Sequence, residues 1–219
     1  AAASAHGMAE AAHVSGSAIM GGLNAQLARA FRDSPDLFPA AEARAFASSH
    51  RAALDRLTPL LDRRGAEGLV RSCHGDMHCG NIVLLDGVPT LFDAIEFSEK
   101  IATIDVLYDL AFLVMDLLHH GEARAANIVL NRYLSLRRQH EDMLGLSALP
   151  LFLSTRAGVR ALVAADRARV DAFHAAGVAH GGTTCEDPPG YREGAAGKIY
   201  LAYLRDPSGN KICAMHRVG

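Results

Sequence analysis

Residues 73–97 read CHGDMHCGNIVLLDGVPTLFDAIEF and contain two apolar runs separated by a turn signal. The first run covers residues 82–85, the turn is Asp86-Gly87, and the second run covers residues 90–92. Asp-Gly between apolar runs is a strong hairpin signal, because glycine accepts the positive φ that a tight turn needs. The stretch therefore predicts a small β-hairpin with polar residues at its open end.

Three oxygen-bearing side chains are expected at that end. Asn81 precedes the first strand, Asp93 follows the second, and Asp76 lies on the loop before both. Mg²⁺ takes oxygen ligands, and one Asp with one Asn can suffice when phosphates supply the rest. A separate Asp can orient an acceptor hydroxyl and accept its proton. The residue types predict a phosphoryl-transfer site, and the alternative is that His-Gly-Asp and Asp-Gly mark ordinary turns.

The amino-acid sequences of two segments resemble those of a known family. HGDMHCGN at residues 74–81, followed by LFDAIEF at residues 91–97, resembles the catalytic core of the aminoglycoside phosphotransferase family of kinase-like enzymes. The resemblance covers roughly residues 15 to 165. It implies a protein-kinase-like C-terminal lobe that contains a small β-hairpin.

The same resemblance implies roles for individual residues. Asp76 would be the catalytic base, and Asn81 and Asp93 would bind Mg²⁺ and, through it, the cofactor. ATP would be the phosphoryl donor, and a hydroxyl of a small molecule of aminoglycoside type would be the acceptor. The protein is therefore expected to be an enzyme, a phosphotransferase with an alcohol acceptor.

Five more polar residues are expected to support this site. The helix start at residues 104–111 (IDVLYDLA) would brace the loop. His78 is expected to form a bracing hydrogen bond, because i, i+4 spacing in a glycine-containing loop does not put two histidines on one helix face. Glu96 could either assist the metal or hold the loop in place, and both roles stay open. The five supporting residues are His74, His78, Glu96, Asp105 and Asp109.

Composition bounds the class of protein. The chain has 219 residues, half of them hydrophobic and about a fifth charged, which is typical of a globular protein. A net charge of −2 gives no footprint for nucleic acid or an anionic membrane. The apolar run 106–118 is too short to cross a membrane, and the opening residues do not read as a secretory signal. Four scattered cysteines favour reduced thiols, so we expect a cytoplasmic protein with no membrane or nucleic-acid partner.

The periodicity of apolar residues predicts an α+β, mostly helical chain. Residues 1–16 are expected to be a flexible N-terminus, and 17–166 to form the kinase-like lobe. Loops are expected at 34–39 and 98–102. Helices are expected over 17–31, 40–64 (with a kink at Pro59), 105–120 (capped by Thr103 or Asp105), 122–138 and 149–165.

One part of a kinase-like enzyme is missing from this pattern. Such enzymes need a glycine-rich loop over the phosphates, a strand lysine and a helix glutamate. Residues 1–70 contain no lysine and no alternating strand pattern. The nucleotide-binding lobe is therefore expected to be absent, and a further N-terminal lobe or another chain would have to complete the ATP site.

Residues 167–219 resemble a different family. They predict a helix over 170–176, then strands over 198–204 and 211–216. The wording VDAFHAAGVAHGG…PPGYR…YLAYLRDPSGNKICAMHR resembles the last half-module of the vicinal oxygen chelate (glyoxalase/bleomycin-resistance) superfamily. A carboxylate commonly binds metal on the last strand of that superfamily, and Cys213 stands at the matching position. Cys213 and His216 are too few ligands for a metal by themselves, which favours a structural hairpin.

Three functions stay open from the sequence. The first is an ATP- and Mg²⁺-dependent phosphotransferase. The second is a non-catalytic remnant or binding module, produced by truncation or fusion. The third is a metal-binding protein of the glyoxalase/bleomycin-resistance type that acts through the tail.

Overall fold

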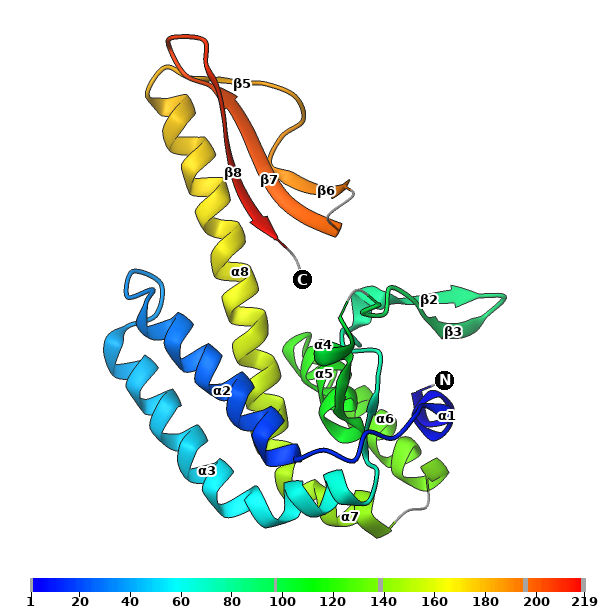
Figure 1. Cartoon of the computed structure of the whole chain (residues 1–219). Helices are drawn as coiled ribbons and strands as arrows, with labels where there is room; N and C mark the ends of the chain where they lie inside the picture. The colour runs from blue at the N-terminus through cyan, green and yellow to red at the C-terminus, as the bar shows by residue number, and fades with distance from the viewer. Residues whose placement is uncertain (1, 97, 138–139, 195–196, 218–219) are drawn as a thin grey trace. The chain divides into compact units, whose positions relative to one another are not determined.

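The computed structural model describes residues 2–96, 98–137, 140–194 and 197–217 (Figure 1). The chain is mostly helical with small sheets and divides into two compact units, Ala1–Gly158 and Val159–Gly219. The expected change of module at residues 166–167 falls inside α8 (Leu149–Ala179), which runs through both units. The assignment of the first unit to a kinase-like lobe stays a prediction.

Helices α2 (Gly16–Arg32) and α3 (Ala40–Ala66) lie side by side in the first unit (Figure 1). They confirm the helices predicted over 17–31 and 40–64, with Pro59 inside α3. Ser15 caps α2, since its hydroxyl accepts a hydrogen bond from Ala18 N at 3.0 Å. The chain enters α2 past the end of α3 so closely that a methyl group at Gly65 would overlap the carbonyl oxygen of Val14.

The N-terminal segment differs from the flexible tail that was expected. Residues 2–8 form a helix, α1 (Ala2–Met8), and Ala11 forms an isolated bridge with Arg71. His6 on α1 is only 2% exposed and is hydrogen-bonded to two buried side chains. The small residues of this segment had favoured a flexible N-terminus. The long-range polar contacts of His6 instead hold the segment against the rest of the first unit.

The hairpin is confirmed where it was predicted. Strands β2 (Ile82–Leu85) and β3 (Val88–Leu91) pair antiparallel, directly after a short 3₁₀ turn, η1 (Cys79–Asn81). Asp86 and Gly87 have φ values of 51° and 77°, the two positive values that a type I′ turn requires.

The segment expected as a loop over 98–102 instead contains a short helix, α4 (Glu99–Ala102). It leads into β4 (Thr103–Asp105), which pairs antiparallel with β1 (Val70–Ser72). Ala102 and Ile104 are each 3% exposed. Burial therefore orders a segment whose sequence pattern predicted no regular secondary structure. Phe97 of the LFDAIEF motif lies outside the described residues.

Further helical segments complete the described part of the first unit. α5 (Val106–His119) confirms the buried helix, and Asp105 is its N-cap. α6 (Ala123–Arg137) confirms the next one, although Arg138 lies outside the described residues. α7 (His140–Gly145) and η2 (Leu146–Ala148) were not predicted. The helices predicted over 149–165 and 170–176 are one continuous helix, α8, since no glycine or proline separates them.

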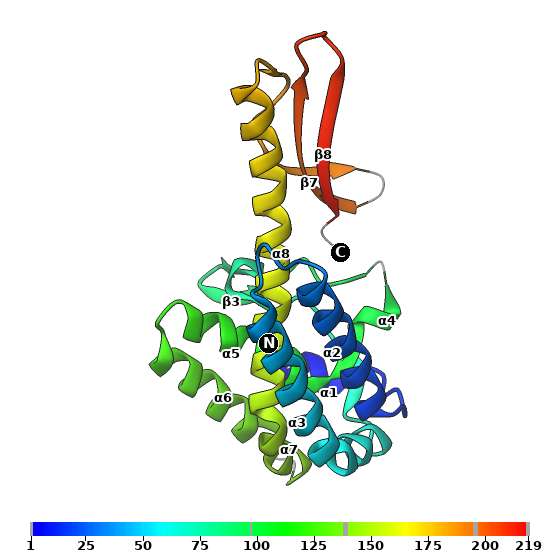
Figure 2. The same ribbon diagram turned by 90° about the vertical axis from the view of Figure 1, so that its left-hand side faces the viewer.

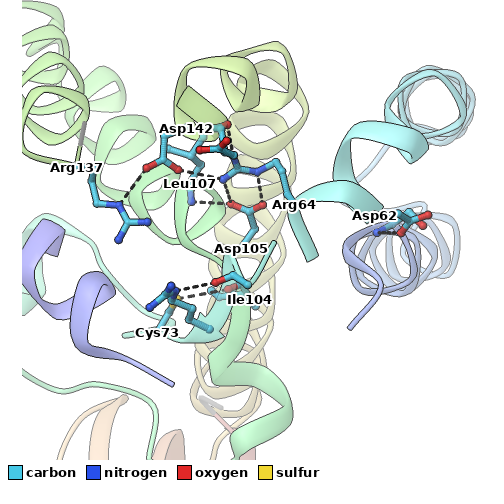
Figure 3. A network of polar contacts seen from close by, with 12 residues as sticks. Asp62, Arg64, Cys73, Ile104, Asp105, Leu107, Arg137 and Asp142 are labelled. Carbon is cyan, nitrogen blue, oxygen red and sulfur yellow. Dashed lines mark hydrogen bonds and ion pairs between the residues drawn. The ribbon is translucent and has the colours of Figure 1, made fainter. Parts of the chain in front are cut away.

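A buried ion network joins α3, the start of α5 and α7 (Figure 3). The guanidinium of Arg64 is bidentate on Asp105, at 2.7 and 2.8 Å, and donates to the carbonyl of Glu141. Asp142 lies 3.5 Å from Arg64 and 3.0 Å from Arg137. These charges are almost fully buried, so each must have its partner for the unit to be stable.

The second unit contains a four-stranded sheet, formed by the C-terminal part of the chain. The hairpin of β7 (Gly197–Arg205) and β8 (Lys211–Arg217) confirms the predicted tail strands (Figure 2). β5 (Thr183–Thr184) and β6 (Gly190–Gly194) pair with the other edge of β7 and were not predicted.

Among the described residues, one helical stretch, His140–Ala179, is long and apolar enough to cross a membrane by length and composition. Length and composition alone are weak evidence, because core helices of soluble proteins pass the same test. The sequence prediction had considered only the shorter run in α5.

Candidate functional site

The candidate site is built on the HGD loop, residues 73–81, which connects β1 to β2. Gly75 has a φ of 80°, and a side chain there would overlap Ile95. Ile95 N donates to the carbonyl of His74 at 2.9 Å. The loop therefore packs directly against the segment that follows the hairpin, and this close approach requires glycine.

Asp76 and Asn81 are brought together as predicted from their spacing. The carboxamide of Asn81 donates from Nδ2 to Asp76 Oδ2 at 3.0 Å and to the Asp76 carbonyl at 2.9 Å. Asn81 is buried, whereas the side chain of Asp76 is 41% exposed. The amide nitrogen is thus committed to the loop, and one carboxylate remains accessible from outside.

His78 braces the loop, in agreement with the predicted hydrogen-bonding role. Its Nδ1 accepts a hydrogen bond from Gly80 N at 3.1 Å, and its Nε2 lies 3.4 Å from Asp76 Oδ2. Burial favours the neutral acid at Asp76, but the contacts with His78 and Asn81 and the charge of Arg156 outweigh it. The pKa of Asp76 is therefore lowered, and its carboxylate is ionised at neutral pH.

The segment that carries Asp93 meets the loop through backbone contacts. Phe92 N donates to the carbonyl of Asn81 at 3.1 Å, and the Phe92 carbonyl accepts from His74 Nε2 at 2.9 Å. Asp93 follows with a φ of 59° and an exposed side chain. The fold brings the predicted ligand segment to the loop. Glu96 is exposed on the same segment.

Asp109 holds the backbone of the HGD loop in place through hydrogen bonds. This fully buried carboxylate accepts hydrogen bonds from His74 N at 3.1 Å and Gly75 N at 2.9 Å. Burial opposes its ionisation, but His6, Arg156 and the Gly75 amide outweigh the burial and lower its pKa. The expected bracing of the loop by the start of this helix comes from Asp109. Asp105, expected in the same role, instead pairs with Arg64 and caps α5.

Three contributors to the site were missed in the sequence. Arg156 on α8 donates to the Gly75 carbonyl at 3.0 Å and stacks on Tyr108 with its guanidinium carbon 3.9 Å from the ring centroid. His6 contacts Asp109 at 3.0 Å, and Asp116 accepts from Cys79 N at 2.9 Å. A charged residue within an apolar helical stretch was the available signal for Arg156 and Asp116, whereas nothing local marked His6.

The proposed soft-metal pair in the tail does not converge. Cys213 and His216 are three positions apart on β8, and side chains on a strand alternate between its faces. The two side chains therefore point to opposite faces of the sheet. His216 Nδ1 lies 3.3 Å from Asp166 Oδ2, while Cys213 is exposed.

Comparisons with known proteins cover only parts of the chain. No family model matches it. Uncharacterized proteins of Mycobacterium tuberculosis and Mycobacterium bovis are 33% identical over 97 residues, which is 44% of this chain and 19% of theirs. The chain spans about a fifth of the length of these curated relatives.

A crystal structure of a glyoxalase/bleomycin resistance protein from Albidiferax ferrireducens is also similar to part of the chain. The match is 74% identical and covers 23% of this chain and 41% of that chain, with a TM-score of 0.23. It supports the vicinal-oxygen-chelate-like tail, while the aminoglycoside phosphotransferase resemblance stays a prediction.

Proposed function

We propose that the HGD loop and the segment after the hairpin are the catalytic half of a phosphoryl-transfer site. One observation carries the proposal: an ionised, accessible Asp76 is held by Asn81 on a loop whose backbone is fixed by the buried Asp109. The acceptor we propose is a hydroxyl of a small molecule, of the aminoglycoside type that the sequence resembles.

Asp76 would act as the base toward that hydroxyl. Because its pKa is lowered, the carboxylate can accept a hydrogen bond from the hydroxyl and orient its oxygen for attack. His78 and Asn81 hold the carboxylate in one orientation, which leaves its exposed side to the acceptor. Positioning of this kind is a large part of catalysis in phosphoryl transfer, since the protein has little covalent chemistry to perform.

The donor set at the loop fits Mg²⁺. Asn81 commits its nitrogen to Asp76 and so has its amide oxygen for a metal, and Asp93 adds an exposed carboxylate. Both are hard oxygen donors. When bound there, Mg²⁺ would offset the negative charge on the phosphoryl oxygens.

The described residues do not fit ATP to the same degree. Residues 2–70 fold as helices α1 to α3 and the first residue of β1, and they contain no lysine. A cradle for the α- and β-phosphates is therefore missing from that part of the structure. We propose that a nucleotide lobe outside it, in a longer protein or in another chain, completes the site.

Metal binding tests the donor set without requiring ATP. Mn²⁺, a paramagnetic substitute for Mg²⁺, is titrated into the full chain and followed by water proton relaxation. Asp93→Asn and Asn81→Ala should weaken binding about tenfold or more, because each removes a ligand. Asp86→Asn is the matched control, since Asp86 is also exposed with a positive φ but lies at the hairpin tip. A parent chain that binds no Mn²⁺, or equal binding by Asp93→Asn and the parent, would contradict the proposal.

Transfer itself is tested with MgATP and a panel of aminoglycosides. Once the proposed nucleotide lobe is supplied, by the longer protein or by the other chain, the parent should form phosphorylated product and Asp76→Asn should not. Equal turnover by the two chains would remove Asp76 from the mechanism. Failure of the parent to transfer phosphate, together with Mn²⁺ binding, would favour the second function, a remnant or binding module.

The similarity of the tail to a glyoxalase/bleomycin resistance protein favours a second candidate, metal binding by residues 167–219. The opposite orientation of Cys213 and His216 argues against these two residues as a joint chelate. We therefore propose a structural role for the tail. Unchanged metal content of a Cys213→Ala variant is the expected result, and a loss would restore the chelate function.

We also propose a cytoplasmic location, without a membrane or nucleic-acid partner. All four cysteines are free thiols, which is usual in a reducing compartment. Partition of the full chain into a membrane pellet would contradict this and would draw attention to residues 140–179.

A further inference from the structure

Three buried side chains behind the HGD loop are of the kinds that bind transition metals. His6, Cys73 and Asp109 each offer one ligand atom, and these atoms lie within 4.8 Å of one another. They come from α1, from the loop directly after β1, and from α5. Imidazole, thiolate and carboxylate are all ligands of Zn²⁺. We propose that His6, Cys73 and Asp109 form a Zn²⁺ site, separate from the Mg²⁺ site proposed at Asn81 and Asp93.

His6 is oriented in the way that metal-binding histidines usually are. Its Nδ1 lies 2.8 Å from the hydroxyl of Tyr133, and its Nε2 lies 3.0 Å from Asp109 Oδ2. Metal-binding histidines commonly hold their second ring nitrogen in such a hydrogen bond, which fixes the ring. Zn²⁺ would take the place of the proton between Nε2 and Oδ2. The ring keeps one proton, which moves to Nδ1 and is donated to the oxygen of Tyr133.

Asp109 can bind a cation without releasing the loop. Its Oδ1 accepts from Gly75 N, and its Oδ2 accepts from both His74 N and His6. A carboxylate has about four lone-pair positions, so both backbone bonds can persist when a cation replaces the contact with His6. Arg156, 3.6 Å from Oδ1, opposes the added positive charge.

Cys73 supplies the negative charge that offsets this repulsion. Within the described part of the chain its thiol makes one long contact, 3.5 Å from Sγ to the Ile104 carbonyl (Figure 3). Burial, together with the nearby Asp109 and Asp105, raises the pKa of the thiol, so that it is protonated when no cation is bound. Zn²⁺ binds the thiolate, and the thiol proton leaves to solvent.

A cavity next to these residues provides room for a fourth ligand. It measures about 250 Å³, and its lining includes His6, Cys73 and His74. The Nε2 of His74 is hydrogen-bonded to the Phe92 carbonyl and so carries the proton, and Nδ1 has no hydrogen-bond partner among the described residues. We assign the fourth position to a water in this cavity. Such a buried site would tie α1 to the base of the HGD loop.

Calorimetric titration of the full, reduced chain with Zn²⁺ alone tests the site. The parent should bind one equivalent. Tyr133→Phe should weaken binding about 10- to 100-fold, because it removes the group that orients His6. Cys73→Ser should weaken it further, and Cys213→Ala, a change at an exposed cysteine, should have no effect.

Cobalt spectroscopy decides the matter even if the Cys73→Ser variant fails to fold. In a chain with Cys79, Cys185 and Cys213 all changed to Ala, Co²⁺ should give the near-ultraviolet charge-transfer band of a cobalt–thiolate bond. Absence of that band overturns the proposal. So does a parent chain that binds no Zn²⁺, or binding that survives Cys73→Ser and is lost in Cys213→Ala. None of these readouts depends on phosphoryl transfer, so this site and the proposed function fail separately.

Discussion

Asp105 and Asp109 lie one helical turn apart at the start of α5, and both are buried, but they serve different regions. Asp105 binds the guanidinium of Arg64 from a helix that precedes it by about forty residues, and it caps its own helix. Asp109 binds the backbone amides of His74 and Gly75 in the HGD loop. A carboxylate that binds a distant cation joins two elements, whereas one that accepts hydrogen bonds from the amides of a loop gives that loop a single shape.

The largest expected effect is on the Arg64 side of this comparison. Asp105→Ala should lower the free energy of unfolding by about 3–5 kcal/mol, because it leaves the Arg64 guanidinium buried without its main partner. Urea denaturation followed by circular dichroism measures this. Asp62→Ala is the control, since Asp62 binds Ser15 near the surface and its loss should cost about 1 kcal/mol or less.

A matched double variant shows whether charge or packing is responsible. Asp105→Leu combined with Arg64→Leu removes both charges and should cost less than the two single changes added together. Additive losses would mean that the two residues contribute independently, and the ion pair would then not explain the stability of this region.

Asp109→Asn should have a smaller and more local effect. The amide can still accept one backbone hydrogen bond, but its Nδ2 cannot accept the second, which leaves one buried N–H without a partner at a cost of about 1–3 kcal/mol. Hydrogen exchange should therefore speed up at His74 and Gly75 more than at the amides of α3. Uniform exchange changes across both regions would show that the two aspartates are not specialised.

The local features of these two regions could be predicted from the sequence, whereas the long-range partners of their residues could not. The Asp86-Gly87 turn and the spacing of Asp76 and Asn81 are properties of neighbouring residues, and the structure has the hairpin and the contact. Asp109 was included only through resemblance. The partner of Asp105 was missed, because nothing in the local pattern of α3 marks Arg64 as buried.

Long-range contacts account for the other differences. α1 was taken for a flexible tail because the segment is rich in small residues, and its order depends on Asp109, 103 positions later. Arg156 reaches the Gly75 carbonyl from 81 positions away. Conversely, the predicted break near residue 166 rested on a change in resemblance, while residues 159–176 contain no proline or glycine to end α8.

Strong acid should weaken the loop region. The folded-state pKa values of Asp76 and Asp109 lie below their ordinary value of 3.8, so their contribution to stability is complete above that pH. It is lost as the pH falls through the lowered values, because the unfolded chain then binds more protons. Asp109→Asn should flatten the decline of unfolding free energy below pH 3.8 that the parent shows.

His50 should make the stability of the first unit depend on pH over a second, higher pH range. It is hydrogen-bonded to Asn24 at 2.7 Å and Ser154 at 2.8 Å, and burial lowers its pKa from 6.5. Stability from the neutral ring is complete above pH 6.5 and declines as the pH falls toward the lowered value. His50→Gln should remove this shallow decline and leave the acid decline of the loop unchanged. Loss of both declines in this variant would mean that the two windows have a common origin.

Asp76→Asn should have the smallest effect on stability and the most specific effect on function. The carboxylate is partly exposed, so the loss of its contact with His78 should cost about 1 kcal/mol or less in urea denaturation. Asn81 can still donate to the new amide oxygen and to the unchanged backbone carbonyl, which preserves the shape of the loop. A destabilisation as large as that of Asp109→Asn would mean that Asp76 is a structural part of the loop. A near-zero change in the free energy of unfolding would agree with a functional role for Asp76. A carboxylate that contributes little to folding can bind the acceptor hydroxyl without loss of stability.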